Sequence, residues 1–467
     1  MKSYLLNLWD TVRTGYWFIP TLLVTGAVCL FATVWMAESR INDFDQLIPT
    51  WIQTTPSTAR ATLSAILGAI IAVTGTLFSV TVVVLSLTSQ QFGPRLLRRF
   101  MYDVQTQITL GVFLATSVHC LLVLRVIIDS PTPAPSLSVA TTIGFTILSM
   151  AALIAFIHHV AILIQAPNVV AAVAADLDQS IKSLFPDRTQ HSTKEREEQE
   201  SLKIKKIEED QGTVNHQIYA QRDGYVQALD LPGIAAWAEE HSLVVRLRVR
   251  PGDFIATGNP IADLWSNNEQ SSESKDDEVG DSDSFNQKVI VGARRTPRQD
   301  VQCAIEELVE VAVRSLSPGI NDPFTAINCI DRLGASISRF SSRDMPSRLH
   351  FASDELRVVT RPYCFAEILD TAFNQIRQNS KDHVAVLIRL VEALSWITTQ
   401  TSQRSRLQAI QRQCDMTARL AQTVRETFDR QDIRDRSNAL NTLISEKLQQ
   451  ADEGGSLGLE MPKSRNL

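Results

Sequence analysis

The sequence predicts an α-helical integral membrane domain with four transmembrane helices, followed by a cytoplasmic α+β region. In that region a small β-rich module precedes a mainly α-helical domain. Three observations lead to this fold class. Long apolar runs are confined to residues 17–165, although 21% of the 467 residues are charged. Strand-like alternation then dominates residues 212–293, and a helical period dominates residues 294–450. The net charge of −6 argues against a nucleic-acid-binding protein.

Four apolar runs are expected to form a transmembrane domain over residues 1–166. A helix needs about 20 residues to cross the hydrocarbon core, and each run meets this requirement. The runs span residues 17–37, 62–88, 107–128 and 137–165. The first run has a signal peptide as its alternative, because Lys2 and Arg13 precede it. Its apolar length exceeds that of a typical signal peptide, and no small-residue cleavage motif follows it.

The distribution of Lys and Arg predicts the orientation of these helices. Basic residues collect on the cytoplasmic side of short membrane connections. With the N-terminus inside, the inner segments hold Lys2, Arg13, Arg95, Arg98, Arg99 and Lys182. The outer loops hold Arg40 and Arg60. We therefore expect a multi-pass membrane protein with both termini in the cytoplasm.

The second apolar run carries a face of small residues. This small-residue face consists of Ser64, Gly68, Ala72, Gly75, Ser79 and Ser86. Small residues at such steps let two helix backbones approach closely in lipid, so the face predicts helix packing and a homo-oligomer. Thr74, Thr81 and Thr88 follow a heptad line on another face. The alternative is that one of these two faces lines a polar pathway.

Three histidines fall inside the apolar runs, where ionisable residues are functional candidates. They are His119, His158 and His159. Haem ligation and proton relay are the functional readings, and a neutral, hydrogen-bonded imidazole at a helix contact is the interpretation that we favour. Adjacent helical residues point about 100° apart, so at most one of His158 and His159 faces a given partner.

A charged linker over residues 167–211 is expected to connect the membrane domain to the β-rich module at 212–293. Within this module, the run VRPGDFIATGNPIADLW resembles the hairpins of biotinyl/lipoyl-type barrel-sandwich domains. The modified lysine of those domains is missing, because Ser266 and two asparagines follow instead. We therefore expect no cofactor. Residues 266–285 contain seven acidic residues and one lysine, which predicts a disordered acidic insertion.

The helical domain at 294–450 contains the one cluster that suggests a ligand site. Arginines beside a helix N-terminus can hold an anion, and Asp322 followed by Pro323 is a strong helix start. The candidate anion site consists of Arg294, Arg295, Arg298, Ser317, Gly319, Asn321 and Asp322. The alternative is that these residues only cap and brace a helical hairpin. The tail at 451–467 is expected to be disordered.

Three motifs connect the chain to a known family. They are RTPRQDVQCAIEELVEVAVRSLSPGINDPFTAINCIDRLG, FSVTVVVLSLTSQQFGPRLLRRF and the FIHHVA–QAPNVV segment. They resemble a family of bacterial predicted inner-membrane proteins of unknown function. The resemblance spans nearly the whole chain and implies four membrane helices followed by a cytoplasmic domain. It implies no activity, substrate or catalytic residue.

Motifs for catalysis are absent from the sequence. There is no P-loop, Rossmann glycine pattern, H-E-x-x-H or G-x-S-x-G, so we expect no enzyme. The six cysteines include no C-x-x-C pair, which predicts reduced thiols and no metal site. Two functional classes remain. One is an oligomeric channel or transporter, regulated by its cytoplasmic domain and partnered by the bilayer and small anions or ions. The alternative is a non-transporting membrane scaffold or sensor.

Overall fold

The computed structural model describes residues 17–40, 54–96, 100, 103–129, 136–187, 200, 202, 216–266 and 282–456. The chain divides into two compact units, residues 1–169 and 170–467. We call them the membrane unit and the C-terminal unit. Of the basic residues that predicted the orientation, Lys2, Arg13, Arg98 and Arg99 lie outside the described residues.

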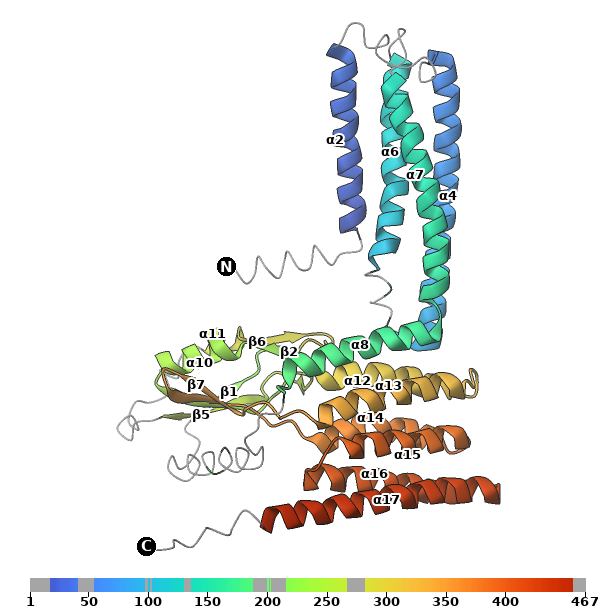
Figure 1. The fold of residues 1–467 in the computed structure, drawn as a ribbon. Coiled ribbons are helices and arrows are strands. Elements are labelled where there is room, and N and C mark those ends of the chain that lie inside the picture. Colours follow the sequence, from blue (N-terminus) through green and yellow to red (C-terminus); the bar gives the residue numbers. More distant parts are fainter. Residues whose placement is uncertain are drawn as a thin grey trace, which may run out of the picture. The chain divides into compact units, whose positions relative to one another are not determined.

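Four long apolar helices make up the membrane unit, as the sequence predicted (Figure 1). They are α2 (Phe18–Arg40), α4 (Pro56–Phe92), α6 (Val104–Asp129) and α7 (Ser136–Leu163). Helix α6 packs extensively against each of the other three, so it forms the centre of the unit. Helices α2 and α6 approach closely at Gly111 of α6, where a Cβ atom would lie 2.6 Å from Cδ1 of Leu23 on α2. Glycine at this position allows the two helices to touch.

Helix α4 is longer than hydropathy predicted. It begins at Pro56 rather than near residue 62, because Thr55 caps it by accepting a hydrogen bond from the backbone N–H of Thr58 at 3.3 Å. Pro56 then occupies the first helical turn, where its missing N–H costs nothing. The 37 residues span about 55 Å, well beyond the hydrocarbon core of about 30 Å.

The sequence predicts a charged linker over residues 167–211, and the structure corrects this prediction for the first part. Residues Ala166–Leu184 form helix α8. Its apolar stripe of Val170, Val173, Leu177 and Ile181 is almost fully buried in the C-terminal unit. Asp178 on the same helix accepts hydrogen bonds from Ser336 and Arg339 of helix α13 (Pro323–Ser341). This helix is therefore part of the C-terminal core.

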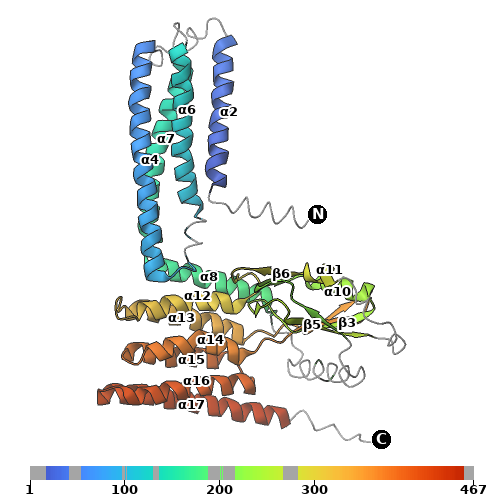
Figure 2. The same cartoon turned by 180° about the vertical axis from the view of Figure 1, so that it is seen from behind.

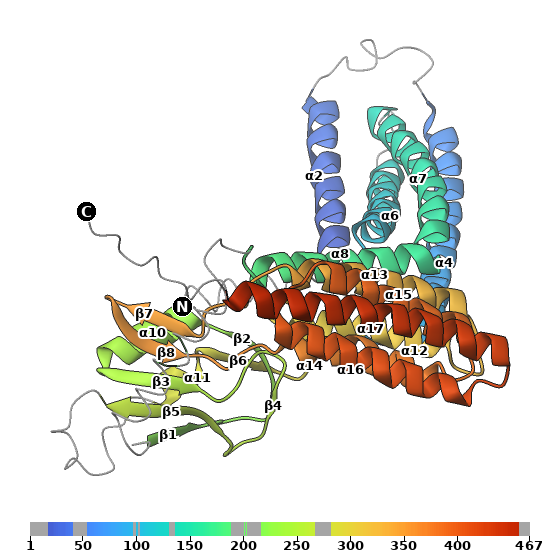
Figure 3. The same cartoon turned by 60° about the horizontal axis from the view of Figure 1, so that its bottom comes forward.

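Two sheets form the β-rich part of the C-terminal unit (Figure 3). The five-stranded sheet has the order β1-β5-β3-β8-β7, and the three-stranded sheet has the order β4-β2-β6. The strands are β1 (His216–Tyr219), β2 (Gly224–Leu229), β3 (Leu243–Leu247), β4 (Phe254–Ile255), β5 (Pro260–Ser266), β6 (Val289–Gly292), β7 (Leu349–Ala352) and β8 (Glu355–Val359). Apolar residues from both sheets and from α10 (Leu231–Glu240) share one buried core, which matches the predicted sandwich-like module.

Two boundaries of this module differ from the sequence prediction. Strands β7 and β8 come from the region expected to be helical, and β8 pairs in parallel with β3, so a division at residue 293 would cut the five-stranded sheet. Residues Ser282–Asn286 form helix α11, although residues 282–285 were expected to belong to the disordered insertion. Phe285 of α11 is fully buried against Trp237, with 5.1 Å between the ring centroids. Residues 267–281 of the predicted insertion lie outside the described residues.

The remaining helices stack on one another (Figure 2). They are α12 (Val301–Ser315), α13 (Pro323–Ser341), α14 (Phe365–Asn379), α15 (Val384–Thr399), α16 (Arg404–Leu420) and α17 (Thr427–Ser456). Helix α14 packs between α12 and α16, and α15 packs between α13 and α17. Helices α13 and α15 cross closely at Gly334, where a Cβ atom would lie 2.9 Å from Cβ of Ala393. Helix α17 extends to residue 456, into the tail expected to be disordered, and residues 457–467 lie outside the described residues.

Candidate functional site

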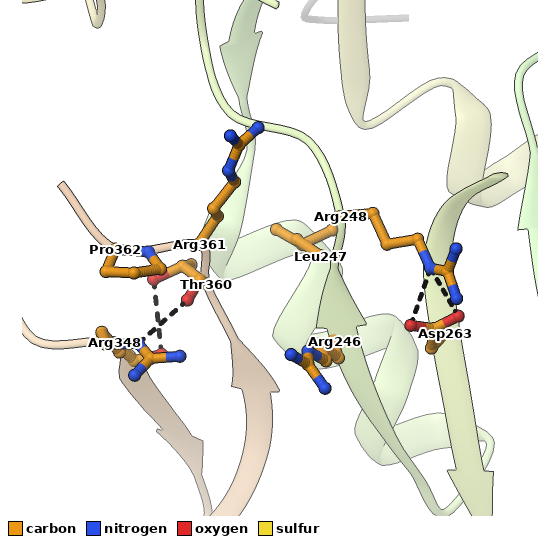
Figure 4. A pocket seen from close by; sticks show the side chains of 8 residues that line it. All are labelled: Arg246, Leu247, Arg248, Asp263, Arg348, Thr360, Arg361 and Pro362. Carbon is orange, nitrogen blue, oxygen red and sulfur yellow. Dashed lines mark hydrogen bonds and ion pairs between the residues drawn. The ribbon is translucent and has the colours of Figure 1, made fainter. Parts of the chain in front are cut away.

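A polar cavity of about 380 Å³ opens on the outer face of the five-stranded sheet (Figure 4). We call it the arginine pocket. Its lining consists of Arg246, Leu247, Arg248, Asp263, Arg348, Thr360, Arg361 and Pro362. Four guanidinium groups and one carboxylate therefore surround the cavity, and they come from two separate stretches of the sequence, residues 246–263 and 348–361.

Strand geometry places these side chains on one face. Successive residues of a strand point to opposite sides, so Arg246 and Arg248 face outward while Val245 and Leu247 enter the core. Antiparallel pairing sets Arg246 opposite Asp263 of β5, and parallel pairing sets it beside Val359 of β8. The residues that follow β8 therefore reach the same face.

The two segments that flank β7 and β8 complete the pocket. The backbone N–H of Thr360 donates to the carbonyl of Arg348 at 2.8 Å, which ties the two segments together. Arg348 also donates through Nε to the carbonyl of Thr360 at 3.5 Å. Arg361 follows directly. This arrangement positions residues that lie about 100 positions beyond β3 in the sequence beside Arg246.

One arginine of the pocket is already neutralised. Nε of Arg248 donates to both carboxylate oxygens of Asp263 at 2.8 Å, and Gln217 donates to Oδ1 of the same carboxylate at 3.0 Å. Asp263 is only 4% exposed. The hydrogen bond to Asp263 raises the pKa of Arg248 above its ordinary value. Figure 4 shows Arg248 turned toward Asp263.

Two further carboxylates lie at the rim. Arg361 pairs with Asp253 at 3.0 Å, and both side chains are substantially exposed. Glu200 accepts hydrogen bonds from the hydroxyl of Ser347 at 2.8 Å and from the backbone N–H of Arg348 at 3.3 Å. Among the described residues, the pocket and its rim thus bring together arginines and carboxylates from separate parts of the chain.

The anion site predicted from sequence is not assembled. Arg294, Arg295 and Arg298 precede α12, whereas Ser317 to Asp322 follow it, and 15 helical residues span about 22 Å. Arg295 forms ion pairs with Asp300 at 2.7 Å and Glu306 at 2.6 Å. The predicted set thus falls at opposite ends of one helix.

The loop that follows α12 has a structural role instead. Asp322 caps α13 by accepting hydrogen bonds from the backbone N–H groups of Phe324 and Thr325 at 3.1 Å. Asn321 adopts a positive φ of 50°, and its backbone N–H donates to the carbonyl of Ser317 at 2.8 Å. Gly319 lies in open space within the same turn. These contacts match the alternative interpretation, in which the residues cap and brace a helical hairpin.

The small-residue face of α4 points away from the rest of the membrane unit. Ser64, Gly68, Ala72, Gly75, Ser79 and Ser86 are all exposed. Cβ atoms built at Gly68 and Gly75 would meet nothing within 4 Å. The opposite side of α4 packs on the unit through Leu63, Ile70 and Leu77. The small-residue face therefore takes no part in packing within one chain.

The threonine line of α4 lies on its packed side. Thr88 is buried, whereas Thr74 and Thr81 are half-buried. The hydroxyl of Thr74 donates to the carbonyl of Ile70 at 2.7 Å, and that of Thr81 donates to the carbonyl of Leu77 at 2.8 Å. Both hydroxyls thus bond to the preceding turn, as threonines in membrane helices commonly do.

Polar side chains also meet inside the membrane unit, between α6 and α7. His119 is fully buried beside Phe145, and its Nδ1 lies 3.1 Å from the hydroxyl of Thr142. Its Nε2 has no hydrogen-bond partner within the part of the chain that the structure describes. One turn away, the hydroxyls of Thr116 and Ser149 lie 2.8 Å apart.

The paired histidines diverge as helical geometry requires. His159 bonds to Asp103 at 2.9 Å, whereas His158 is exposed. Among the described residues, no group of three or more His, Cys, Asp or Glu side chains is arranged to hold a metal ion.

The fold defines an integral membrane protein with four apolar helices and a large C-terminal unit of sheets and stacked helices. The chain belongs to the family described as "Predicted membrane protein (DUF2254)", whose model matches residues 13–395. This agrees with the resemblance found in the sequence.

Curated relatives extend over almost the same length. The chain is 27% identical over 432 residues to "Uncharacterized protein MT1328" of Mycobacterium tuberculosis (strain CDC 1551 / Oshkosh). It is equally similar to "Uncharacterized protein Mb1321c" of Mycobacterium bovis (strain ATCC BAA-935 / AF2122/97). Each match covers 91% of this chain and 79% of the relative. No solved structure matches the chain.

Proposed function

We propose that this membrane protein is a homo-oligomeric channel or transporter that its C-terminal unit regulates. The observation that carries the proposal is the outward direction of the small-residue face on α4, with open space beside Gly68 and Gly75. Small residues let helix backbones approach closely in lipid, so a second copy of the chain fits this face. A path for ions would then form between subunits.

The interior of the single membrane unit supports a path between subunits rather than within one. Ile70 and Leu77 of α4, Phe113 of α6 and Phe156 of α7 form a buried apolar cluster. Bulky apolar side chains in close contact leave no room for a hydrated ion. An intersubunit path needs no such opening in the single chain.

The regulatory part of the proposal is supported by the short connection between α7 and α8. Helix α8 begins three residues after α7 ends, and its apolar stripe is buried in the C-terminal unit. A change in the packing of the C-terminal unit would therefore pull on the last membrane helix through a connection of only two residues, Ile164 and Gln165.

We also propose that the protein lies in a bacterial inner membrane with both termini in the cytoplasm. The distribution of Lys and Arg supports this orientation. Topology reporters fused after residues 50, 100, 132 and 460 should read outside, inside, outside and inside. Any other order contradicts the proposed orientation.

Flux through purified protein in liposomes tests the transport proposal. The intact chain should pass K⁺ or Cl⁻, and a chain truncated after residue 190 should lose regulation. Ser79→Trp should block or alter flux and oligomer size, because it fills the small-residue face. Val80→Trp is the matched control, since Val80 is 40% exposed but points about 100° away from Ser79.

The alternative function is a non-transporting scaffold or sensor. If the intact chain passes neither ion under any membrane potential or tension applied, that alternative replaces the channel or transporter. If Ser79→Trp and Val80→Trp behave alike, the small-residue face is not a subunit contact.

A further inference from the structure

We propose that the loop between α12 and α13 inserts two apolar side chains, Ile320 and Phe324, among the lipid headgroups of the membrane that α7 crosses. We call these two residues the anchor pair. The inference goes beyond the proposed function, because a lipid contact of this kind suits a channel, a transporter and a scaffold alike.

The anchor pair consists of apolar side chains that the fold leaves exposed. Phe324 is 79% exposed in the first turn of α13, and Ile320 is 42% exposed in the turn before it. Asp322 fixes the backbone between them, because its carboxylate accepts hydrogen bonds from the backbone N–H groups of Phe324 and Thr325. Its own backbone N–H donates to the carbonyl of Ser315 at 2.7 Å. Exposed apolar side chains that gather on one patch mark contact with a protein or a membrane.

Helices α8 and α13 run side by side in the same direction (Figures 1 and 2). Asp178 of α8 accepts hydrogen bonds from Ser336 and Arg339 of α13. Further along both segments, Phe185 packs edge-on against Phe340 with 4.7 Å between the ring centroids. Contacts that advance in the same sense along two helices mean that both helices begin at the same end.

The first turns of these two helices lie level with each other. Ala166 of α8 precedes Asp178 by 12 residues, which is about 18 Å along the helix. Phe324 of α13 precedes Ser336 by the same number of residues. Helix α7 is long and apolar enough to cross a membrane, and it ends three residues before Ala166. Three residues reach at most about 11 Å, so the chain itself keeps the anchor pair within reach of lipid.

Both segments that meet here are almost free of charge. Residues 160–175 contain no Asp, Glu, Lys, Arg or His, and residues 315–330 contain Asp322 as their one charged residue. Over the whole chain, 21% of the residues are charged. A surface without charges can enter the boundary between headgroups and acyl chains without removing ions from water, so lipid suits this patch.

Phe428 provides a comparison on the same fold. It is 84% exposed in the first turn of α17, which makes it similar to Phe324 in residue type and position. Four charged residues flank it in the sequence, namely Arg425, Glu426, Asp429 and Arg430. Moving them out of water would cost more than one phenylalanine gains, so Phe428 should remain in water.

Spin labels on the full-length protein test the proposal. Serine first replaces the exposed native cysteines, Cys29 and Cys364. A nitroxide is then attached to Ile320→Cys, to Phe324→Cys or, as the matched control, to Phe428→Cys. Each labelled protein is placed in liposomes of phosphatidylcholine and phosphatidylglycerol. Collisions of the nitroxide are measured with oxygen, which concentrates in lipid, and with an uncharged nickel chelate, which stays in water.

The labels at positions 320 and 324 should collide more often with oxygen than with the nickel chelate. The ratio of the two collision rates should be several-fold higher at these positions than at position 428. All three side chains are exposed, so the substitutions should leave the melting temperature of the protein unchanged, which verifies that each variant is folded.

Two results would overturn the proposal. If the ratio at positions 320 and 324 equals the ratio at position 428, the anchor pair faces water. If the labels at 320 and 324 meet neither reagent and show dipolar broadening, a second copy of the chain covers the patch instead of lipid. No flux is measured, so either result leaves the channel or transporter proposal to its own test.

Discussion

Phe285→Ala should destabilise the β-rich part of the C-terminal unit, although Phe285 ends a stretch that is rich in serine and acidic residues. Phe285 is fully buried and stacks edge-on against Trp237 at 5.1 Å. A buried phenylalanine removes about 200 Å² from water, worth at most about 5 kcal/mol at about 25 cal/mol per Å². Measured Phe→Ala changes in cores cost about 3–5 kcal/mol. We expect about 4 kcal/mol.

Hydrogen exchange on the full chain measures this loss locally. The backbone N–H of Val226 donates to Asp253 and that of Asp230 donates to Lys288, and both bonds hold the three-stranded sheet and its neighbours together. A loss of about 4 kcal/mol should speed their exchange by about 10³-fold if they open together with the core.

Phe351→Ala is the matched control, because Phe351 is 54% exposed on β7. Its cost should stay within about 0.5 kcal/mol. If Phe285→Ala changes exchange at Val226 and Asp230 by less than about fivefold, or if the two variants behave alike, the burial of Phe285 does not hold this core together and the reasoning is refuted.

Three further predictions concern other parts of the C-terminal unit. Gly334→Val should lower the free energy of unfolding by about 1–3 kcal/mol in thermal denaturation, because the new Cβ would lie 2.9 Å from Cβ of Ala393. Adding Ala393→Gly should recover part of this loss, and unchanged stability of Gly334→Val would contradict the close crossing of α13 and α15. Burial lowers the pKa of His350, although the charge of Glu200 opposes this shift, so the unfolded chain binds the proton more tightly than the folded chain does. The contribution of His350 to stability should therefore be fully present above about pH 6.5 and be lost as the pH falls through the lower folded-state pKa. His350→Gln should flatten this dependence of the unfolding free energy on pH. Cys364 is exposed, whereas Cys329 is buried and its burial raises the pKa of the thiol. A maleimide should therefore label Cys364 in the folded protein and Cys329 only after denaturation, which mass spectrometry of the labelled peptides measures.

Apolar length was sufficient to predict the membrane helices, because the cost of burying polar groups in lipid leaves few alternatives. Periodicity likewise predicted that the six small residues between Ser64 and Ser86 of α4 share one face of the helix. It could not tell whether that face points inward or outward, since this depends on which helices pack beside α4. The structure answers that question through Leu63, Ile70 and Leu77, which pack on the other side.

The missed elements have different causes. Helix α8 does carry a detectable signal, because Val173, Leu177 and Ile181 recur every four residues, but charged residues nearby suggested a linker. The β7–β8 hairpin is short. Its turn at Ser353 and Asp354, with φ values of 47° and 63°, lacks the glycine that usually marks such a turn.

The arginine pocket could not have been found by spacing. Arg246 and Arg248 look like ordinary outward residues of a strand, and their neighbours Arg348 and Arg361 lie about 100 positions later. Only the parallel pairing of β3 with β8 brings them together. The predicted cluster around Arg295 and Asp322 is not brought together, because α12 lies between its two parts. Here residues that are close in sequence are kept apart by the length of a helix.

The central place of α6 has a consequence for how the chain is made. The main neighbour of α2 is α6, which touches it at Gly111, and the end of α6 is synthesised about 90 residues after the end of α2. At about 5–20 residues per second, the ribosome needs about 5–18 s to cover that distance. During this interval α2 has left the ribosome without its partner, with its small and polar residues facing lipid or the insertion machinery. The packing of α2 on α6 can therefore form only late in the synthesis of the membrane unit, after α4 is complete.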